Sequence, residues 1–380
     1  MLSGLTITRA SKSRIGEVDF ENLPFGAVFS DHMFSMSYSE GRWGDPRIEP
    51  YGPISLDPGT AMLHYGQTVF DGLKAFRGVD GAARVFRPER NAARLRESAA
   101  RLCIPPVEEE VFIGAIRHLI ELDHRWLPRH EGQALYIRPL LIGTEAHLDV
   151  RPDTTYRFLM MTAPVGAYFD QNSGGVSLKA EATYTRAAAK GGMGYAKTAG
   201  NYAAGMLATA NARREGFDQV LWLDSEQHRF VEEVGAMNIF FKTAGAGGSG
   251  GSGGSVITPP LGGSILPGVT RDSVIALIRD RGLTVEERPI AIEEVMDGIA
   301  GGFIEEVFGA GTAAVIAPVE RLEYLGRNET LKNVPGPLTL ALYDEIVGIQ
   351  TGRLPDRHGW NMIVPLPASE AAAPMAVSSG

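Results

Sequence analysis

Cysteine is almost absent from this chain of 380 residues, which contains Cys103 and no other. A single cysteine excludes an intramolecular disulfide framework and any zinc cluster built on cysteine thiolates. The eight histidines show neither His-x-x-x-His nor His-x-His spacing. Histidines without such spacing are more often surface or packed imidazoles than metal ligands. We therefore predict no metal site.

Positive charge is also in short supply, because 36 Lys and Arg residues face 45 Asp and Glu residues, for a net charge of −9. An acidic chain without a basic stripe is a poor candidate for binding nucleic acid or an anionic membrane surface. No apolar run approaches the roughly 18 residues of a membrane span. Residues 1–16 are basic and faintly resemble a transit peptide, but they lack the apolar core of a secretory signal. We expect a disordered N-terminus and a cytoplasmic protein.

Apolar residues make up 44% of the chain and charged residues 21%, which is typical of a globular protein with a large core. The length favours two domains. The polar stretch 170–176 is predicted to join a small N-terminal domain, 1–169, to a larger C-terminal domain, 177–366. The Ala/Ser/Pro-rich tail, 367–380, is predicted to be disordered. The Gly-Gly-Ser repeats at 247–255 are predicted to form the long tip of a hairpin.

Hydrophobic spacing predicts helices and strands in both halves of the chain. The expected helices are 87–102, 111–127, one that follows Gly200 and ends near Arg214, and one that begins near Gly268 and ends near Arg281. The expected strands are 134–142, 156–165, 176–184, 219–223, 234–242 and a single strand over 305–319 with a glycine-rich turn at its start.

Two common motifs are present only in weak form. Gly247–Gly251 matches the Gly-x-Ser-x-Gly nucleophile pattern but lies within low-complexity sequence. Gly191–Thr198 is one residue short of a phosphate-binding P-loop, because Ala196 stands where that motif needs glycine. The residues before it are small and polar, not a buried strand. A P-loop phosphotransferase is therefore an alternative that a nucleotide-binding titration would exclude.

Lys197 stands alone among glycine, alanine, threonine and asparagine, with no carboxylate near it in the sequence. An ordinary solvated lysine near a helix start explains this position. Against that interpretation, a cation at a helix N-terminus opposes the helix dipole. A desolvated lysine there would have a lowered pKa and would be a good nucleophile toward an aldehyde.

Two further segments are suited to binding an anion. Leu266–Arg271 places glycine and threonine at a predicted helix start, where free backbone N–H groups favour a phosphate. Gly309–Ala313 is a second turn of small residues with one hydroxyl. Either segment alone is more often just a cap or a turn. Together with a reactive Lys197, they favour a phosphorylated aldehyde cofactor, pyridoxal phosphate.

Seven segments in order carry a resemblance to a known family. They are Phe25–Met33, His64–Phe76, Tyr136–Pro139, Gly194–Tyr202, Glu233–Asn238, Leu266–Arg271 and Glu306–Ala313. In this order they resemble the branched-chain amino acid aminotransferases, pyridoxal-phosphate enzymes of fold type IV. The resemblance implies an α/β (α+β) fold with a smaller N-terminal α/β domain and a larger C-terminal domain with a β-barrel-like core. The cofactor would lie between these domains, at a homodimer interface.

The resemblance also implies roles for individual residues. Lys197 corresponds to the lysine that bonds the cofactor and later moves the proton, and Glu233 to the carboxylate that pairs with the pyridine nitrogen. Tyr202 corresponds to the tyrosine at the phenolic oxygen, and Arg94 to the arginine at the phosphate. The phosphate site would be completed by Val269, Thr270 and Thr312. Without the resemblance, Glu233, Tyr202 and Arg94 would be an acidic residue beside a strand, a core aromatic and an exposed arginine.

The implied reaction moves the amino group of L-leucine, L-isoleucine or L-valine to 2-oxoglutarate, in ping-pong order. The substrate pocket would contain Tyr65, Phe70, Tyr136, Arg138 and Tyr168, whose aromatic walls and placed cation serve both substrates. The α-carboxylate would meet the backbone near Ala313. Leu148 and Val150 correspond to residues that reach the neighbouring subunit's site.

The chain departs from the family at a few positions. Ala236 stands where many members have a threonine, and Asp71 where glutamate is more usual. Ala314 and Ala317 occupy the positions of a redox Cys-x-x-Cys, so we expect no thiol switch. A D-amino acid aminotransferase, or a lyase acting on an aminochorismate-type substrate, would share Lys197 but not the segments around Phe70 and Tyr136.

Overall fold

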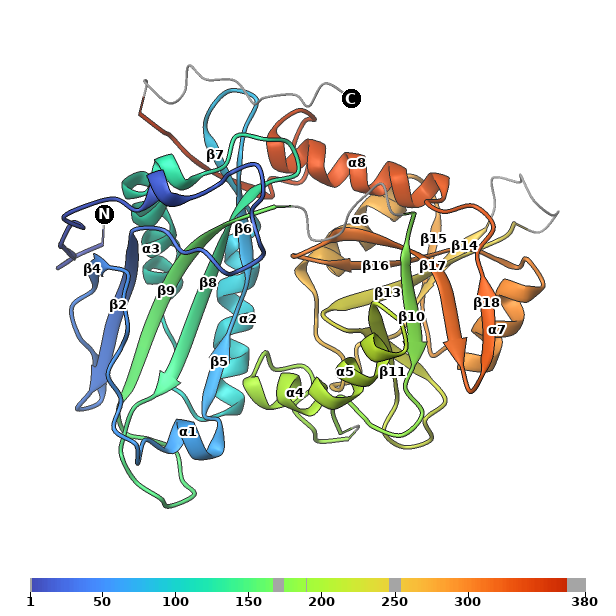
Figure 1. Cartoon of the computed structure of the whole chain (residues 1–380), viewed down its shortest axis with the longest axis horizontal. Helices are drawn as coiled ribbons and strands as arrows, with labels where there is room; N and C mark the ends of the chain where they lie inside the picture. Colours follow the sequence, from blue (N-terminus) through green and yellow to red (C-terminus); the bar gives the residue numbers. More distant parts are fainter. Residues whose placement is uncertain (1, 167–173, 189, 246–253, 368–380) are drawn as a thin grey trace. The chain divides into compact units, whose positions relative to one another are not determined.

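The computed structural model describes residues 2–166, 174–188, 190–245 and 254–367 (Figure 1). Two compact units are distinguished by their internal contacts. Unit 1 comprises Met1–Tyr168, Ala196–Ala199 and Gly348–Gly380, and unit 2 comprises Phe169–Tyr195 and Gly200–Val347. Among the described residues, no helix is long and apolar enough to cross a membrane.

Unit 1 is built on a mixed, largely antiparallel sheet of ten strands, in the order β1-β4-β2-β9-β8-β6-β7-β19, with β3 paired to β2 and β5 to β8. Its strands are β1 (Thr6–Ile7), β2 (His32–Ser39), β3 (Arg42–Trp43), β4 (Arg47–Pro50), β5 (Thr68–Phe70), β6 (Leu73–Arg77), β7 (Ala83–Phe86), β8 (Ala134–Gly143), β9 (Tyr156–Val165) and β19 (Asn361–Val364). Its helices are α1 (Ala61–Tyr65), α2 (Pro88–Arg101) and α3 (Glu109–Leu122), with short 3₁₀ turns at Ile15–Glu17 and His124–Trp126.

Helices α2 and α3 supply the apolar core of unit 1. Their buried residues include Leu95, Ile116 and Leu119, which join a cluster with Phe158 and Ile137 from the sheet. Side chains alternate between the two faces of a strand. The residues that alternate with Ile137 in β8, including Tyr136 and Arg138, therefore lie on the opposite face from this core.

Unit 2 is a closed barrel with additional strands. Six strands form the ring β12-β11-β10-β17-β16-β13, which the pairing of β13 with β12 closes. The strands of unit 2 are β10 (Val176–Ala180), β11 (Gln219–Leu223), β12 (Val231–Val234), β13 (Met237–Thr243), β14 (Ser255–Thr258), β15 (Thr284–Glu287), β16 (Ile304–Gly311), β17 (Val315–Tyr324) and β18 (Arg327–Thr330). The remaining helices are α4 (Ala199–Ala204), α5 (Met206–Arg214), α6 (Val269–Asp280), α7 (Ile292–Ala300) and α8 (Pro337–Thr351). The predicted mixed fold with a barrel-like core is confirmed.

Five predicted elements differ from the structure. The strand predicted over 234–242 is interrupted by the turn between β12 and β13, and the helix predicted to follow Gly200 and to end near Arg214 is divided at Gly205 into α4 and α5. The helix predicted over 111–127 ends at Leu122 and is followed by the 3₁₀ turn at His124–Trp126; the carboxylate of the intervening Asp123 lies 2.7 Å from Nδ1 of His32. The strand predicted over 176–184 ends at Ala180. The single strand predicted over 305–319 is wrong, since β16 and β17 are separate antiparallel strands in which Gly311 pairs with Val315.

The termini of the chain also differ from the predictions. Of the first ten residues, the described ones make regular contacts: β1 pairs with β4, and the Ala10 N–H donates to Nε2 of His32 at 2.9 Å. The C-terminal domain was predicted to continue to residue 366, whereas β19 forms an edge of the unit 1 sheet beside β7. The Gly-Ser stretch lies mostly outside the described residues, but the flanking strands β13 and β14 pair antiparallel as a hairpin requires. The tail from residue 368 also lies outside them.

Candidate active site

Lys197 lies beside the end of β5 in unit 1. Its backbone N–H donates to the Ser98 hydroxyl at 2.9 Å, and its carbonyl accepts from the Phe70 N–H at 3.0 Å. The neighbouring Thr198 forms a β-bridge with Val69. These contacts hold the half-buried Lys197 side chain over the Phe70 ring, with Nζ 5.1 Å from the ring centroid.

The charge of Lys197 acts on the carboxylate of Asp71, which is completely buried. Burial by itself would raise the pKa of Asp71. The charge and hydrogen bonds of Arg94, the charge of Lys197 and the amide of Asn91 outweigh burial, so the pKa of Asp71 is lowered and it carries a negative charge. Arg94 binds it through Nε at 2.9 Å and Nη2 at 2.7 Å, and Asn91 donates at 2.8 Å. Asp71 therefore shares one polar cluster with Arg94, Asn91 and Lys197, although from the sequence it was noted only as a departure from the family.

Helix α2 presents three of these polar groups from one buried face. Asn91, Arg94 and Ser98 are 1%, 6% and 0% exposed. Their spacing of three and four residues places them above one another on an α-helix. Asn91 and Ser98 could have been predicted from the sequence, because polar residues recur there at helical spacing among apolar ones.

Arg138 and Tyr136 form a second group around Phe70. The Arg138 guanidinium lies 4.8 Å from the Phe70 ring centroid, and its Nη2 donates to the Tyr136 hydroxyl at 3.0 Å. Its buried Nε has no hydrogen-bond partner among the described residues. A Cβ on Gly72 would lie 1.9 Å from that hydroxyl, so only glycine fits beneath it. Phe70 therefore has two cations near its ring, Lys197 and Arg138.

The loop between β8 and β9 carries the predicted residues Leu148 and Val150, which are 69% and 79% exposed. The Tyr65 hydroxyl donates to the Leu148 carbonyl at 2.7 Å. Deeper in the loop, Glu145 is bound bidentately by Arg151. The loop therefore has internal bonds that hold its exposed apolar residues in place.

The same loop contains Glu145, His147 and Asp153, whose candidate metal-ligand atoms lie within 4.8 Å of one another. These groups already have partners. Glu145 is paired with Arg151 and with the Thr154 hydroxyl, and His147 Nε2 lies 3.0 Å from Asp153 Oδ1. Arg151 already compensates the charge of Glu145, and His147 already has a partner in Asp153, so these contacts are explained without a metal ion.

Glu233 occupies β12 of unit 2 and is 3% exposed. The Nε of Arg186, which is also buried, lies 2.5 Å from Glu233 Oε1. The Leu266 N–H donates to Oε2 at 3.4 Å. In contrast, burial raises the pKa of the neighbouring Glu232, although its bond from Ser264 and the charge of Arg186 oppose that effect. Of this acidic pair, Glu233 therefore has the direct cationic partner, which sequence reasoning did not identify.

The pairing of β12, β13 and β16 places the turn that contains Thr312 close to the level of Glu233 in the sheet. Glu233 pairs with Asn238, and Asn238 pairs with Ala310, just before the turn that contains Thr312 and Ala313. The Asn238 amide also donates to the Leu266 carbonyl at 3.0 Å, next to the start of α6.

Helix α6 begins with Val269 and Thr270, which are 8% and 7% exposed. It has no side-chain cap, so the first N–H groups of a 12-residue helix are not used by a capping side chain. A Cβ on the preceding Gly268 would lie 2.1 Å from Asn238 Oδ1. This uncapped start is a suitable anion site.

The other predicted residues are placed as follows. Tyr202 is half-buried on α4, and Ala236 lies in the turn between β12 and β13. Tyr168 lies outside the described residues. The P-loop alternative lacks its strand, because β10 ends at Ala180 and no strand follows before Lys197 in the described part of that segment.

Comparisons with known proteins identify the family. The model for amino-transferase class IV matches residues 68–322. A branched-chain-amino-acid aminotransferase from Mycobacterium tuberculosis is 50% identical over 340 residues, covering 88% of this chain and 90% of the relative. Branched-chain-amino-acid aminotransferase 2 of Bacillus subtilis is 47% identical over 344 residues, covering 90% and 92%.

A solved structure is similar as well. A T.th. branched-chain amino acid aminotransferase, complexed with N-(5'-phosphopyridoxyl)-L-glutamate, matches with a TM-score of 0.69 and 26% identity, covering 86% of this chain and 97% of that one. The chain therefore belongs to the class IV aminotransferases of fold type IV. Within that class, its activity is that of a branched-chain-amino-acid aminotransferase, as in these relatives, and the resemblance is confirmed.

Proposed function

We propose that this enzyme uses pyridoxal 5'-phosphate to transfer the amino group of L-leucine, L-isoleucine or L-valine to 2-oxoglutarate, producing branched 2-oxo acids and L-glutamate. The observation that carries the proposal is the cluster in which Lys197 and Arg138 both lie over Phe70 while Asp71 binds Arg94. It combines a lysine nucleophile, a second cation for a dicarboxylate and an oriented arginine for a phosphate.

The described residues fit the cofactor in three respects. The uncapped start of α6 offers backbone N–H groups to a phosphate. Arg94 is held in orientation by Asp71, and the buried Glu233 is suited to a protonated ring nitrogen. The solved T.th. relative binds a phosphopyridoxyl compound, which supports the same cofactor here.

Each residue then has a defined task. Lys197 binds the cofactor through Nζ and moves a proton at the substrate α-carbon. Glu233 holds a proton at the pyridine nitrogen, and Tyr202 binds the phenolic oxygen. Phosphate binding is assigned to Arg94, Val269, Thr270 and Thr312. When bound, pyridoxal phosphate supplies the electron-accepting ring that stabilises charge at the α-carbon.

The substrate residues support two different side chains in one pocket. Phe70 and Tyr136 offer apolar ring faces to a branched side chain, together with Tyr65 and Tyr168. Arg138 offers its guanidinium, with one buried donor still unpartnered among the described residues, to the distal carboxylate of glutamate. The backbone at Ala313 is assigned to the α-carboxylate.

The enzyme is also proposed to act as a cytoplasmic homodimer, in which Leu148 and Val150 of one subunit reach the site of the other. Their high exposure supports this role, because exposed apolar side chains on an internally bonded loop are suited to a protein interface.

The deciding experiment is the absorbance spectrum of the purified enzyme before and after addition of L-leucine. We expect a visible cofactor band that bleaches with L-leucine and returns with 2-oxoglutarate. A band that ignores L-leucine but responds to a D-amino acid would instead favour the D-specific sister activity.

The Lys197→Ala variant should lose the visible band and at least a thousandfold in turnover, since both the bond and the proton transfer depend on Nζ. Lys190→Ala is the matched control, because Lys190 is an exposed lysine of the same segment. Normal turnover in Lys197→Ala would overturn the assignment.

A further inference from the structure

We propose that Arg186, which lies between β10 and α4, is a positioning residue that decides where the proton between Glu233 and the ring nitrogen of the cofactor resides. By stabilising the Glu233 carboxylate as an anion, Arg186 places that proton on the nitrogen. The inference rests on the proposed function, because it takes pyridoxal phosphate as the cofactor and Glu233 as the partner of the ring nitrogen. It adds to that function a residue that acts through Glu233.

Arg186 lies at a buried junction of unit 2. It is 6% exposed, and Glu233 is 3% exposed. Its Nε lies 2.5 Å from Oε1 of Glu233. Its Nη1 donates to the Ser264 carbonyl at 3.1 Å and to the Gly194 carbonyl at 3.3 Å. The guanidinium therefore contacts three segments at once, and it cannot move away from Glu233 without breaking its hydrogen bonds to the backbone.

The two backbone segments that accept from Arg186 are packed tightly against each other. A Cβ on Gly194 would lie 1.9 Å from the Ser264 carbonyl oxygen, so only glycine fits there. Gly194 precedes Lys197 by three residues in the sequence, and Ser264 precedes the start of α6 by five. Arg186 is therefore fixed in place by its surroundings, as a residue that orients another must be.

The two acidic residues of β12 show what the cation does. Burial makes the charged form of a carboxylate unfavourable, and it raises the pKa of Glu232. The hydrogen bond from Ser264 and the charge of Arg186 oppose that effect, whereas the charge of Asp224 adds to it. Glu233 is buried more deeply, but it has Arg186 in direct contact. This contact favours the ionised carboxylate at Glu233.

A single proton lies between two basic atoms, Oε2 of Glu233 and the ring nitrogen. On the oxygen it gives a neutral acid and a neutral ring, and on the nitrogen it gives a carboxylate and a cationic ring. Arg186 contacts Oε1, so it is closer to the carboxylate than to a group bound at Oε2. Because a charge acts more strongly at the shorter distance, Arg186 stabilises the carboxylate more than it opposes the cationic ring. The nitrogen therefore carries the proton, which makes the ring the stronger electron acceptor.

The test is nitrogen-15 nuclear magnetic resonance of the holoenzyme, loaded with pyridoxal phosphate that carries the isotope in its ring. The chemical shift of a pyridine nitrogen changes strongly on protonation, so the signal reports where the proton lies. In the wild type we expect the signal of a protonated nitrogen. In Arg186→Met, which removes the charge, the buried Glu233 should take up the proton, and the signal should move to the unprotonated position.

Two further substitutions separate the charge of Arg186 from its other contacts. Arg186→Lys keeps the charge and should retain the wild-type signal. Arg186→Gln keeps hydrogen-bond donors without the charge and should behave like Arg186→Met, so the test stands if Arg186→Met folds poorly. The rate at which saturating L-leucine bleaches the cofactor band should fall roughly tenfold or more in the two uncharged variants, since a neutral ring is a weaker electron acceptor.

Arg84→Met is the matched control. Arg84 is a comparably buried arginine, 8% exposed, whose Nη1 lies 2.5 Å from a carboxylate oxygen of Asp80. It belongs to unit 1 and to neither the cofactor set nor the substrate set. Its variant should lose stability but keep the ring-nitrogen signal of the wild type.

Three results would overturn the inference. They are an unprotonated ring nitrogen in the wild type, which needs no variant to observe, a protonated one in folded Arg186→Met or Arg186→Gln, and an equal displacement of the signal in Arg84→Met. Failure of the proposed function is distinguishable from all three. In that case the wild-type chain would bind no pyridoxal phosphate, or its visible band would not respond to L-leucine.

Discussion

At the scale of the single residue, Gly72 shows how a small side chain positions a larger one. The Tyr136 hydroxyl occupies the space where a Cβ would be, 1.9 Å from its ideal position, and that hydroxyl accepts a hydrogen bond from Arg138. The Gly72→Ala change must displace Tyr136 and remove this bond. Because a hydrogen bond to a charged group contributes roughly 1.5–3 kcal/mol, we expect kcat/KM for 2-oxoglutarate to fall about tenfold to a hundredfold.

Steady-state kinetics with both substrates measures this effect. The loss should be larger for 2-oxoglutarate than for L-leucine, since the distal carboxylate is assigned to Arg138. Gly52→Ala is the control, because a Cβ there meets nothing within 4 Å. Equal losses for the two substrates would contradict a specific role for the Tyr136–Arg138 pair.

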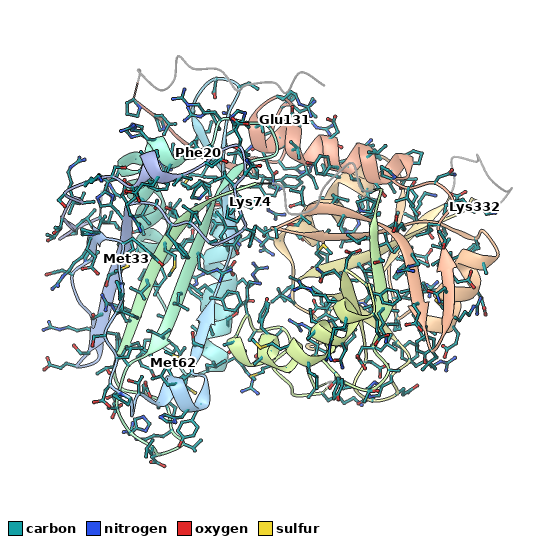
Figure 2. All side chains as sticks on the ribbon, in the orientation of Figure 1. Phe20, Met33, Met62, Lys74, Glu131 and Lys332 are labelled. Atoms are coloured by element: carbon teal, nitrogen blue, oxygen red, sulfur yellow. The ribbon has the colours of Figure 1, made fainter. Side chains whose placement is uncertain are left out.

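Lys74 is a second residue whose environment has a measurable consequence. It lies on β6, where Figure 2 labels it. Its side chain is 5% exposed, and burial lowers its pKa to about 8. Between pH 8 and about 10.5, the ordinary pKa of lysine, the unfolded chain holds a proton that folded Lys74 has lost. Stability from this residue therefore rises with pH across that window, and the full penalty of burying the charge applies below it.

The Lys74→Met variant lacks this penalty. At pH 7 its free energy of unfolding should exceed that of the wild type by the cost of burying the charge. This difference should decrease by roughly 3 kcal/mol from pH 7 to pH 10.5, because each unit of difference between the folded and unfolded pKa corresponds to about 1.4 kcal/mol. Urea unfolding followed at several pH values gives the comparison. Lys332→Met removes an exposed lysine labelled in Figure 2, and its free energy of unfolding should change with pH as that of the wild type does. The same pH dependence in Lys74→Met would contradict the prediction.

At the scale of the element, α2 contributes buried polar groups as well as core packing. Its residue Arg94 forms a buried ion pair with Asp71, and removing one partner of such a pair leaves the other charge uncompensated. We expect Asp71→Asn to lower the free energy of unfolding by about 3–5 kcal/mol. Glu293→Gln is the control, because its pair with Arg229 is more than half exposed and should contribute less than about 1 kcal/mol.

The pH dependence provides a second readout for Asp71. Its pKa is lowered in the folded state, so its contribution to stability is present above the ordinary aspartate pKa and decreases as the pH falls through the lowered value. This acid dependence should be weaker in Asp71→Asn. An unfolding midpoint like that of Glu293→Gln would show that the buried pair is not important for stability.

The elements also show what local sequence patterns can and cannot predict. α2 and β9 were predicted closely, because three- to four-residue spacing and apolar, aromatic-rich runs are local signals. The division of 305–319 into β16 and β17 was missed, because the positive φ falls on Val315 and not on a glycine. The ion pairs of Asp71 with Arg94 and of Arg186 with Glu233 were missed for another reason: their partners are far apart in sequence and depend on strand register.

At the scale of the whole molecule, the association of subunits into a dimer was predicted only from the resemblance to the family, and not from the residues themselves. The proposed contact elements are Leu148 and Val150, exposed on a loop that the Glu145–Arg151 pair stabilises from within. Because their side chains contribute little to the core of the subunit, charging them should leave the fold intact. The same change would place two charges in an apolar interface, where they have no partner.

We therefore expect the Leu148→Asp/Val150→Asp variant to weaken dimerisation at least a hundredfold, measured by sedimentation equilibrium, while its circular dichroism stays that of the wild type. Turnover should fall with the dimer fraction and recover as the protein concentration rises, since the loop is proposed to complete the neighbouring site. Leu325→Asp is the control: Leu325 is equally exposed, at 73%, but lies in unit 2, and its left-handed backbone tolerates aspartate. A variant that stays dimeric would exclude this loop from the interface. A variant that is monomeric and fully active would show instead that each subunit completes its own site.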